Sequence, residues 1–252
     1  MMRCFRFLLF FLFISLNAEP KELIFHAEYF PPFICSQKSD LPGFAVEVLK
    51  ALYPEKEFRI SIRYCGWQNA AKQLKQNKIS AYIGMSKADY PEFPVTRDPI
   101  FRLQSAVYLK SDLDLKYTGP ESLAKIKTGF QVDYSHSDGF DAYQKQHSKD
   151  GSLRYYRKNR AAENMIKGLA SGKIQAFVHY TAAVQWALRN QPESRKILKR
   201  IAVLDNSTDF YVVFARKKES KELIGIFNRR FPEFIKTEKY RGLLRKYGLD
   251  EK

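Results

Sequence analysis

Residues Leu74 to Phe101 read LKQNKISAYIGMSKADYPEFPVTRDPIF and carry the clearest structural signal in the chain. The order of residues predicts the end of a helix, a turn at Asn77–Lys78 and a short buried strand over Ile79–Ile83. Gly84-Met85-Ser86 follows at the point where such a strand would open into a cleft. The segment therefore predicts a helix–turn–strand unit whose last residues face a crevice.

The same pattern returns about ninety residues later, where Leu169 to Tyr180 read LASGKIQAFVHY. In both copies a Leu is followed three residues on by Asn or Gly, and then by Lys-Ile-x-Ala and two apolar residues. This echo predicts two α/β lobes, each of which directs a strand end towards a shared crevice. Ligands bind at such strand ends in open α/β sheets.

The order of predicted elements in the first lobe is β-α-β-α-β, which is typical of a parallel sheet with helices on its faces. Residues 58–64 alternate apolar and polar side chains, as a strand with one covered face does. Further strands are expected at residues 23–27, 101–109, 127–132, 153–156, 174–178 and 210–215. Helices are expected at residues 43–52, 68–76, 140–146, 161–169 and 181–189, and over 221–247 with an interruption at Pro232.

The N-terminus has the features of a secretory signal peptide. Arg3 and Arg6 precede an apolar run over residues 7–16, and Ala18 lies at a plausible cleavage point. The run is short of the roughly 20 apolar residues that span a bilayer, so we interpret residues 1–18 as a cleaved signal peptide and expect an exported, soluble protein. An uncleaved membrane anchor is the alternative.

The chain is strongly basic, with a formal net charge of +16 over 252 residues. Loss of residues 1–18, which hold two arginines and no acid, leaves 234 residues with a net charge of +14. Such a surplus can indicate binding to nucleic acid or to an anionic membrane. The basic residues are spread along the whole chain, however, so we expect a solvated basic surface and no nucleic-acid partner.

Two cysteines, Cys35 and Cys65, remain after loss of the signal peptide. An even pair in an exported protein predicts a disulfide, and closing a loop of about 30 residues would stabilise the fold by roughly 3–4 kcal/mol. Neither cysteine has a Cys or His at metal-ligand spacing. We therefore expect a disulfide and no metal site.

No established motif for enzymatic chemistry is present. The four histidines, His26, His136, His147 and His179, lack metal-site spacing. The chain also has no nucleophile elbow, phosphate-binding loop or dinucleotide fingerprint. The sequence therefore predicts a protein that is not an enzyme and needs no cofactor.

Several motifs in order along the mature chain resemble the bacterial periplasmic solute-binding proteins of family 3, the substrate-binding domains of polar-amino-acid-type ABC transporters. The motifs are Pro31-Pro32-Phe33, Gly43 to Val48, Trp67, Gly84-Met85-Ser86 leading to Asp98-Pro99, Leu169 to Ala176, and Phe227-Asn228 through Lys246-Tyr247-Gly248. The resemblance implies a type II periplasmic-binding-protein fold, in which two α/β lobes joined by two hinge crossings close on a small ligand. It also implies a monomer.

The resemblance places lobe 1 at residues 19–111 and 206–252, and lobe 2 at residues 112–205. The crossings would lie near residues 110–118 and 203–210. The expected location is the periplasm, and the expected partners are a small-molecule ligand and a membrane permease or sensor receptor.

The chain departs from the amino-acid binders of this family at both ends of their ligand clamp. They usually place an arginine shortly after the Gly-Met-Thr/Ser turn to pair with the ligand carboxylate, whereas this chain has Asp89-Tyr90-Pro91. They usually carry an aspartate after the second-lobe strand to hold the ligand ammonium, whereas this chain has His179-Tyr180. We therefore expect a ligand that is not a standard α-amino acid.

Aromatic and neutral residues replace the clamp and predict a ligand with a flat or apolar body, bound by ring stacking and hydroxyl groups. Ser86 and Ser135 would hold an anionic or carbonyl group beside helix starts, and Arg97 would supply a cation. Each aromatic ring is also consistent with packing inside a lobe. The complete predicted ligand-binding set is Tyr29, Phe30, Trp67, Met85, Ser86, Tyr90, Arg97, Tyr134, Ser135, His136, His179 and Tyr180.

Three functions are compatible with this reasoning. The first is delivery of a solute to an ABC-type permease, and the second is ligand sensing by docking on a membrane receptor. The third is an elimination reaction like that of the periplasmic cyclohexadienyl dehydratases, which share the fold and need a cleft carboxylic acid. Glu28, Asp89 and Asp133 are available for that role, but no paired arrangement selects one of them.

Overall fold

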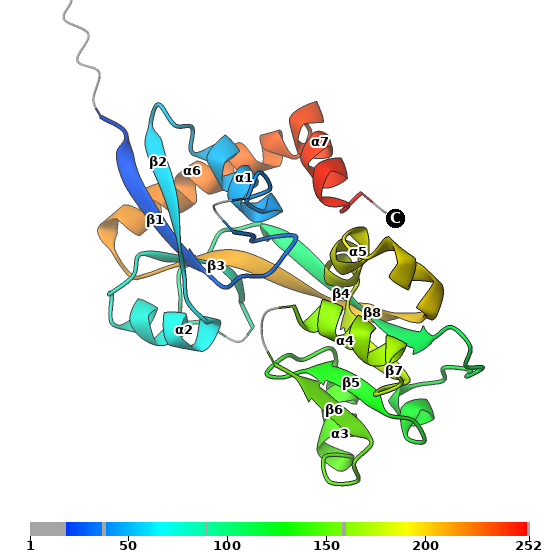
Figure 1. Ribbon diagram of the computed structural model, residues 1–252. Coiled ribbons are helices and arrows are strands. Elements are labelled where there is room, and N and C mark those ends of the chain that lie inside the picture. The colour runs from blue at the N-terminus through cyan, green and yellow to red at the C-terminus, as the bar shows by residue number, and fades with distance from the viewer. Residues whose placement is uncertain (1–18, 37–38, 89, 158–159, 251–252) are drawn as a thin grey trace, which may run out of the picture.

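The computed structural model describes residues 19–36, 39–88, 90–157 and 160–250 (Figure 1). The predicted signal peptide and Asp89 lie outside the described residues. In the described part of the chain no helix is both long and apolar enough to span a membrane.

Two units with the same β-α-β-α-β order form most of the fold, as the sequence predicts. The first unit contains β1 (Lys21–Ala27), α1 (Phe44–Leu52), β2 (Phe58–Tyr64), α2 (Trp67–Lys75) and β3 (Ala81–Ser86). The second unit contains β5 (Thr128–Gln131), α3 (Asp138–Gln146), β6 (Leu153–Tyr156), α4 (Ala161–Ala170) and β7 (Ala176–Tyr180).

The remaining elements link and flank the two units. They are β4 (Phe101–Lys110), the short helix η1 (Pro120–Leu123), α5 (Thr181–Arg189), the short helix η2 (Pro192–Ile197), β8 (Leu198–Phe214), α6 (Lys218–Phe234) and α7 (Glu238–Tyr247). The strand predicted at residues 210–215 is thus the end of a much longer strand. Polar residues occupy its middle, so hydrophobic alternation did not reveal its full length.

The described residues form an eight-stranded sheet in the order β2-β1-β3-β8-β4-β7-β5-β6. In each unit the first strand pairs in parallel with the other two, so β1 lies between β2 and β3, and β5 lies between β6 and β7. The third strand then pairs antiparallel with one of the long central strands, β3 with β8 and β7 with β4. The two halves of the sheet are therefore topological counterparts.

The long strands β4 and β8 join the two halves. They pair antiparallel from Phe101–Phe210 at one end to Lys110–Leu198 at the other, and they run between the two groups of helices in Figure 1. The two connections between the halves therefore lie side by side in one ribbon. The fold class predicted from the sequence is confirmed.

Both copies of the sequence echo form the same helix-to-strand turn. After α2, Asn77 has a left-handed φ of 53°, and after α4, Gly172 has a φ of 70°. The residue after each donates its N–H five positions back, Lys78 to the Gln73 oxygen and Lys173 to the Gly168 oxygen. This pattern is the Schellman termination of a helix, which favours Asn or Gly at the left-handed position.

The strand after each turn begins two residues later than the sequence predicts. The predicted starts were Ile79 and Ile174, whereas β3 begins at Ala81 and β7 begins at Ala176. In both copies the isoleucine is buried under the preceding helix before sheet pairing starts. Its burial, which suggested a strand, therefore comes from packing in the turn.

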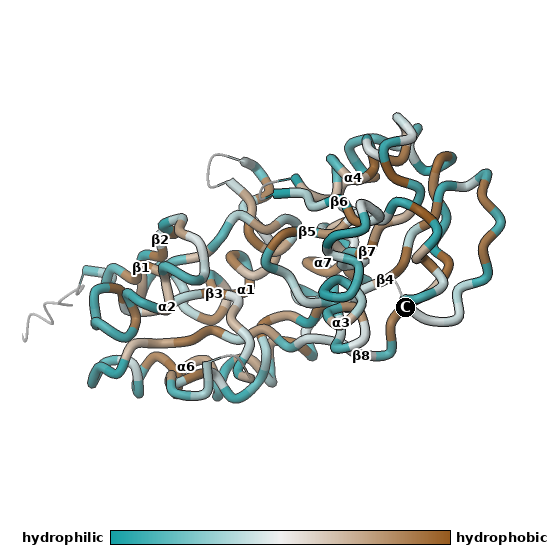
Figure 2. The backbone as a smooth tube through the Cα atoms, turned by 90° about the horizontal axis from the view of Figure 1, so that it is seen from below, coloured by the Kyte–Doolittle hydropathy of each residue, from teal (hydrophilic) through white to brown (hydrophobic). Residues whose placement is uncertain are grey.

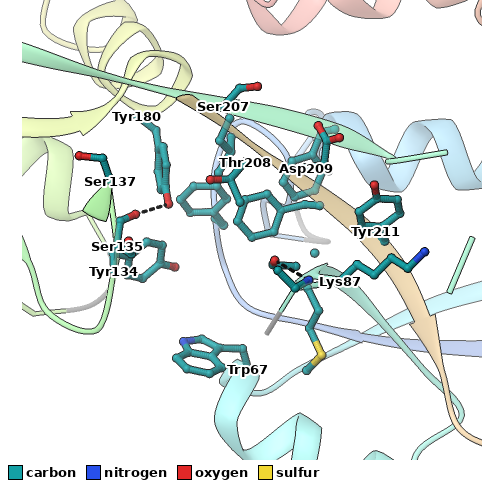
Figure 3. Close-up of a pocket in the computed structure, with 18 of the residues that line it drawn as sticks. Trp67, Lys87, Tyr134, Ser135, Ser137, Tyr180, Ser207, Thr208, Asp209 and Tyr211 are labelled. Carbon is teal, nitrogen blue, oxygen red and sulfur yellow. Dashed lines mark hydrogen bonds between the residues drawn. The ribbon is translucent and has the colours of Figure 1, made fainter. Parts of the chain in front are cut away.

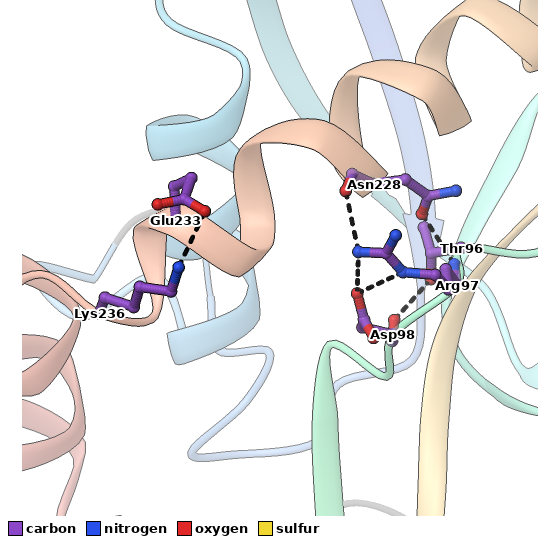
Figure 4. A network of polar contacts seen from close by, with 6 residues as sticks. All are labelled: Thr96, Arg97, Asp98, Asn228, Glu233 and Lys236. Carbon is purple, nitrogen blue, oxygen red and sulfur yellow. Dashed lines mark hydrogen bonds and ion pairs between the residues drawn. The ribbon is translucent and has the colours of Figure 1, made fainter.

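The C-terminal segment forms two helices as predicted, but the break lies at residues 235–237 and not at Pro232, because α6 continues to Phe234. Proline has no N–H to donate to the carbonyl four residues back, which belongs to Asn228. The guanidinium of Arg97 donates to that carbonyl oxygen over 3.2 Å, and the Arg97 backbone N–H donates to the Asn228 side chain over 2.7 Å (Figure 4). Arg97 thus compensates for the hydrogen bond that Pro232 cannot make.

Buried apolar side chains form clusters in both halves of the molecule. The backbone coloured by hydropathy shows an elongated molecule with many hydrophilic segments in its outer turns (Figure 2). Phe25 and Phe214 pack edge to face in the first half, and Phe130 and Phe140 pack together in the second. At the C-terminal end, Trp186 of α5 stacks on Tyr247 of α7, with ring centroids 6.1 Å apart. The last helix therefore touches both halves.

The predicted disulfide is not formed, because Cys35 and Cys65 are both free. Cys35 is buried in the loop after β1, where its carbonyl oxygen accepts a hydrogen bond from the Tyr64 hydroxyl. Cys65 instead packs against the apolar cluster under α2. Burial raises the pKa of the Cys35 thiol to about 12, so this thiol stays protonated and unreactive at neutral pH.

Candidate functional site

A cleft of about 1230 Å³ lies between the two halves of the molecule. Its walls contain residues that follow or end the first and third strands of each unit: Glu28 after β1, Ser86 at the end of β3, Asp133 after β5 and Tyr180 at the end of β7. The carboxyl ends of parallel strands meet at one edge of a sheet, which is where open α/β folds bind ligands. The cleft is therefore the candidate site.

Each part of the fold contributes its own side chains to the cleft (Figure 3). Trp67 and Lys87 come from α2 and from the turn after β3, while Tyr134, Ser135 and Ser137 come from the loop between β5 and α3. The long strand β8 supplies the segment from Ser207 to Tyr211. Neither half alone forms the site.

Gly84 explains how β3 opens into the cleft. It has a φ of 90°, a conformation that L side chains rarely adopt, and a Cβ there would lie 3.1 Å from Cζ of Phe101. The pairing of β3 with β8 shifts register between Ile83 and Met85. This bulge directs Met85 and Ser86 to the cleft, although Met85 is only 2% exposed.

Aromatic rings connect the two halves at the floor of the cleft. Phe30, which follows β1, lies 6.1 Å from the ring of Tyr134 and 6.0 Å from the ring of Tyr180. On the other wall, the rings of Trp67 and Tyr90 meet edge to face at 6.1 Å. A flat ligand entering the cleft would therefore meet ring surfaces from both units.

Two hydroxyl groups of the second unit donate their protons within the protein. Ser135 donates to a carboxylate oxygen of Asp141 over 2.6 Å, and Tyr180 donates to the backbone oxygen of Ser135 over 3.2 Å. Neither hydroxyl therefore donates into the cleft. This geometry argues against the predicted role of Ser135 as a donor to an anion or carbonyl. Ser86 accepts from the N–H of Ala88 over 3.2 Å, so its proton is not used in that bond.

His136 and His179 lie behind the cleft wall and do not line it. Both are buried, with exposed fractions of 3% and 2%, and their rings meet edge to face at 6.1 Å. Nδ1 of His136 lies 2.9 Å from Oγ of Ser105 on β4. Burial lowers the pKa of His136 to about 4, and burial followed by the charge of His136 lowers the pKa of His179 to about 3. Both are therefore neutral at pH 7.

The other predicted residues also include some that line the cleft and some that do not. Tyr29 and Arg97 do not line the cleft, and the Arg97 guanidinium instead pairs with Asp98 and with the carbonyl of Asn228 (Figure 4). Eight of the twelve predicted residues do line it: Phe30, Trp67, Met85, Ser86, Tyr90, Tyr134, Ser135 and Tyr180. Their contact with a ligand stays a prediction.

Sequence reasoning missed most of the charged residues in the cleft. The described residues that line it include five carboxylates, Glu28, Asp133, Asp138, Asp205 and Asp209, and one cationic side chain, Lys87. Arg102 holds Asp209 through two hydrogen bonds of 2.5 and 3.2 Å. The polar segment before the apolar end of β8 could have revealed these residues. Polar side chains inside a central strand indicate that one face of that strand is exposed to solvent.

A metal centre finds no support within residues 19–36, 39–88, 90–157 and 160–250. No group of three or more His, Cys, Asp and Glu side chains there could hold a metal ion. The cleft carboxylates come from separate elements, and the two buried histidines lie behind the wall. The described lining offers a ligand aromatic rings, hydroxyl groups and carboxylates.

No protein-family model matches the chain, and no curated protein matches its sequence. Similarity of structure is nevertheless extensive. An ancestral arginine-binding protein bound to arginine matches with a TM-score of 0.69 at 20% sequence identity, over 91% of this chain and 99% of that one.

Two other solved structures match to a similar extent. A histidine kinase sensor domain with similarity to periplasmic binding proteins has a TM-score of 0.68 at 16% identity, over 91% of this chain and 96% of that one. A structure on glutathione import via GshT and the cystine ABC importer TcyBC of Streptococcus mutans has a TM-score of 0.70 at 17% identity, over 90% and 95% of the two chains. At these identities the likeness establishes the fold, which is that of periplasmic solute-binding proteins and related sensor domains.

Proposed function

We propose that this protein binds a small organic solute in the cleft between its two units and presents the closed complex to a membrane partner. The observation that carries the proposal is the composition of the cleft walls. Residues from the strand ends of both units and from β8 surround one volume of about 1230 Å³. A ligand that touches both walls favours the closed arrangement by its differential contacts.

The aromatic floor and the connecting strands support closure about a hinge. Phe30 already meets Tyr134 and Tyr180 across the cleft floor, while β4 and β8 form the connection between the units. Rings of both units would cover the faces of a flat ligand, and hydroxyl and carboxylate oxygens would fix its orientation. We propose lobe limits of 19–111 with 206–252 and of 112–205.

Delivery to an ABC-type permease is the first candidate for the downstream step, with the protein exported to the periplasm and acting as a monomer. The basic start and apolar run of residues 1–18 support export. Sensing is the second candidate, because the chain shares its fold with a histidine kinase sensor domain. Co-purification of the ligand-bound protein with a membrane permease or with a receptor kinase separates the two.

Catalysis is the least supported alternative. Glu28 and Asp133 line the cleft, and an acid-assisted elimination would need one of them protonated beside cations for the substrate carboxylates. The described lining offers Lys87 alone for that purpose. Incubation of the purified protein with prephenate or arogenate tests this alternative, and formation of an aromatic product would support it.

A thermal-shift screen of metabolites tests binding without an assumed ligand, because stabilisation follows mass action. The double variant Trp67→Ala/Ser86→Ala should abolish stabilisation by any compound that raises the melting temperature of the wild type. Trp186→Phe is the matched control, since Trp186 stacks on Tyr247 away from the cleft. Because the chain has two tryptophans, this control also leaves Trp67 as the sole tryptophan fluorophore.

The expected result is stabilisation and a ligand-dependent change in Trp67 fluorescence in the Trp186→Phe protein, with no stabilisation of the double variant. Small-angle scattering should show compaction with the same compound. Equal stabilisation of the double variant would place the binding site outside this cleft and contradict the proposal.

A further inference from the structure

We infer that the cleft selects an organic cation without a carboxylate group, such as an amine or guanidine attached to an apolar body. This inference deepens the proposed function and rests on it. It arises from the signs of the charges in the cleft and from the direction of its hydrogen bonds, two observations that the aromatic lining by itself does not imply.

The cleft has the opposite charge to the rest of the molecule. The chain carries a formal net charge of +16, whereas the described lining contains five carboxylates against Lys87. Arg102 neutralises Asp209, but Asp133, Asp138 and Asp205 take part in none of the ion pairs among described residues. A cleft with low-dielectric walls concentrates such a field and attracts cations.

The carboxylates are distributed over both halves of the fold. Glu28 follows β1, Asp133 and Asp138 flank the loop before α3, and Asp205 lies on β8. A cation between the units would therefore be attracted by each of them, and its binding would reduce the repulsion between their charges as the units approach. An anionic ligand would increase that repulsion.

One carboxylate lies beside the aromatic walls. Burial first, and the charge of Glu28 next, raise the pKa of both Tyr82 and Tyr134. These tyrosines line the cleft from different units. Glu28, Phe30 and Tyr134 line the same cleft, so an ammonium or guanidinium attracted by Glu28 would enter among ring surfaces, where cation–π attraction adds to the ion pair.

Two hydroxyl groups of the second unit are consistent with the same ligand chemistry. Ser135 and Tyr180 donate to Asp141 and to the Ser135 carbonyl, so these two groups offer a ligand their oxygen atoms as acceptors, whereas Ser86 keeps its proton in the bond from Ala88. A ligand carboxylate requires several donors, preferably an arginine fork. The described lining includes no arginine, and its one lysine, Lys87, is exposed at the edge of the cleft.

Matched pairs of compounds that differ by one carboxylate test the inference directly. The pairs are agmatine with arginine, cadaverine with lysine and phenethylamine with phenylalanine, with glutamate as an anionic probe. We expect at least one amine to stabilise the protein and to bind at least 10-fold more tightly than its carboxylated partner by calorimetry. Equal or tighter binding of the carboxylated partners, or no binding of any amine, would overturn the inference.

Charge-neutral variants test the site. The double variant Asp133→Asn/Asp138→Asn should weaken amine binding at least 10-fold and reduce its salt dependence, because it removes two carboxylates. Asparagine tolerates the left-handed φ of 64° at position 133, so the fold should persist, and the melting temperature without ligand checks this. Asp114→Asn, an exposed aspartate outside the cleft, is the matched control and should bind as the wild type does.

The outcomes separate this inference from the proposed function. If the metabolite screen finds an anionic or zwitterionic compound whose binding needs Trp67 and Ser86, the solute-binding function stands and the cationic class is wrong. If amines bind but the Asp133→Asn/Asp138→Asn protein binds them as tightly as the Asp114→Asn protein, the cleft carboxylates do not select the ligand and the inference is overturned.

Discussion

The two β-α-β-α-β units share a topology and differ at the ends of their third strands. Counting from the shared Leu of each echo, Gly84 corresponds to His179 and Met85 corresponds to Tyr180. In the first unit Gly84 forms a bulge, and the following residues open into the cleft. In the second unit His179 and Tyr180 continue regular pairing with β4, and α5 begins at the next residue.

The register shift beside Gly84 and the regular pairing at His179 therefore give the two strand ends different backbone paths. The first unit supplies half-buried residues, Trp67, Ser86 and Tyr90, on a face that a ligand can reach. The second unit instead buries two histidines and a tyrosine, His136, His179 and Tyr180. The side chains named here therefore differ in exposure between the two walls, although residues of both units line the cleft.

The largest expected effect is on the pH dependence of stability, and it comes from the buried histidines of the second unit. His136 and His179 have folded-state pKa values below the ordinary value of 6.5, because burial disfavours their charged forms. The unfolded chain then binds more protons between pH 6.5 and about 4, so the free energy of unfolding should fall as the pH falls through this window. Each histidine contributes about 1.4 kcal/mol per pH unit. Denaturant unfolding at several pH values measures the slope.

His136→Asn should reduce the change of unfolding free energy with pH by about 1.4 kcal/mol per pH unit, the contribution of one histidine. His147 provides an internal control, because hydrogen bonds to Asp150 and then Glu121 raise its pKa. Nuclear magnetic resonance titration should give a midpoint above 6.5 for His147, and no protonation of His136 above pH 5. A midpoint for His136 near 6.5 would contradict the sealed environment of the second strand end.

The second prediction compares the loss of unfolding free energy when one tyrosine ring is removed from each wall of the cleft. Tyr180→Ala removes a ring that is 4% exposed and that contacts Phe30, Tyr134 and both histidines, so we expect a loss of about 3 kcal/mol of unfolding free energy. Tyr90→Ala removes a half-buried ring from the first wall, and we expect a loss of about 1 kcal/mol. Urea denaturation of the two variants measures both values. Equal losses would mean that the two walls do not differ in packing.

The smallest expected effect concerns the helix-ending turn that both units share. Gly172→Ala places a methyl group in open space but at a φ of 70°, so we expect a loss of about 1 kcal/mol from backbone strain alone. Asn77→Gly, at the corresponding turn, should change the stability by less than about 0.5 kcal/mol. Gly225→Ala, a helical glycine with open space around it, is the control and should be neutral or stabilising. A destabilisation by Asn77→Gly as large as that by Gly172→Ala would show that the turns are not equivalent.

The sequence predicted features that depend on a few adjacent residues. The turn at Asn77 and Lys78 and the helix over Thr181–Arg189 were correctly predicted, because turn residues and 3.6-residue periodicity act locally. Errors arose where distant segments meet. Arg97 compensates for Pro232 by donating to the Asn228 carbonyl, 131 positions away. Strand β8 runs to 17 residues because β3 and β4 pair with it along its length.

The prediction of the cleft also failed where distant segments meet. Eight of the predicted ligand-binding residues line it, because strand ends and aromatic residues are visible in the sequence. The burial of His136 and His179, the bond between Ser135 and Asp141, and the acidic lining depend on which elements pack together. These features therefore required the tertiary structure.

The sequence by itself determined the repeated α/β units, the helix-ending turns and the strand ends at which a ligand site was expected, since hydrophobic periodicity and backbone preferences act over a few residues. The tertiary structure decided which of those strand ends stays open, which thiols stay apart and which charges face the cleft. The physical reason is that burial, pKa and hydrogen-bond direction depend on neighbours brought together by folding, and those neighbours are often a hundred or more residues away along the chain.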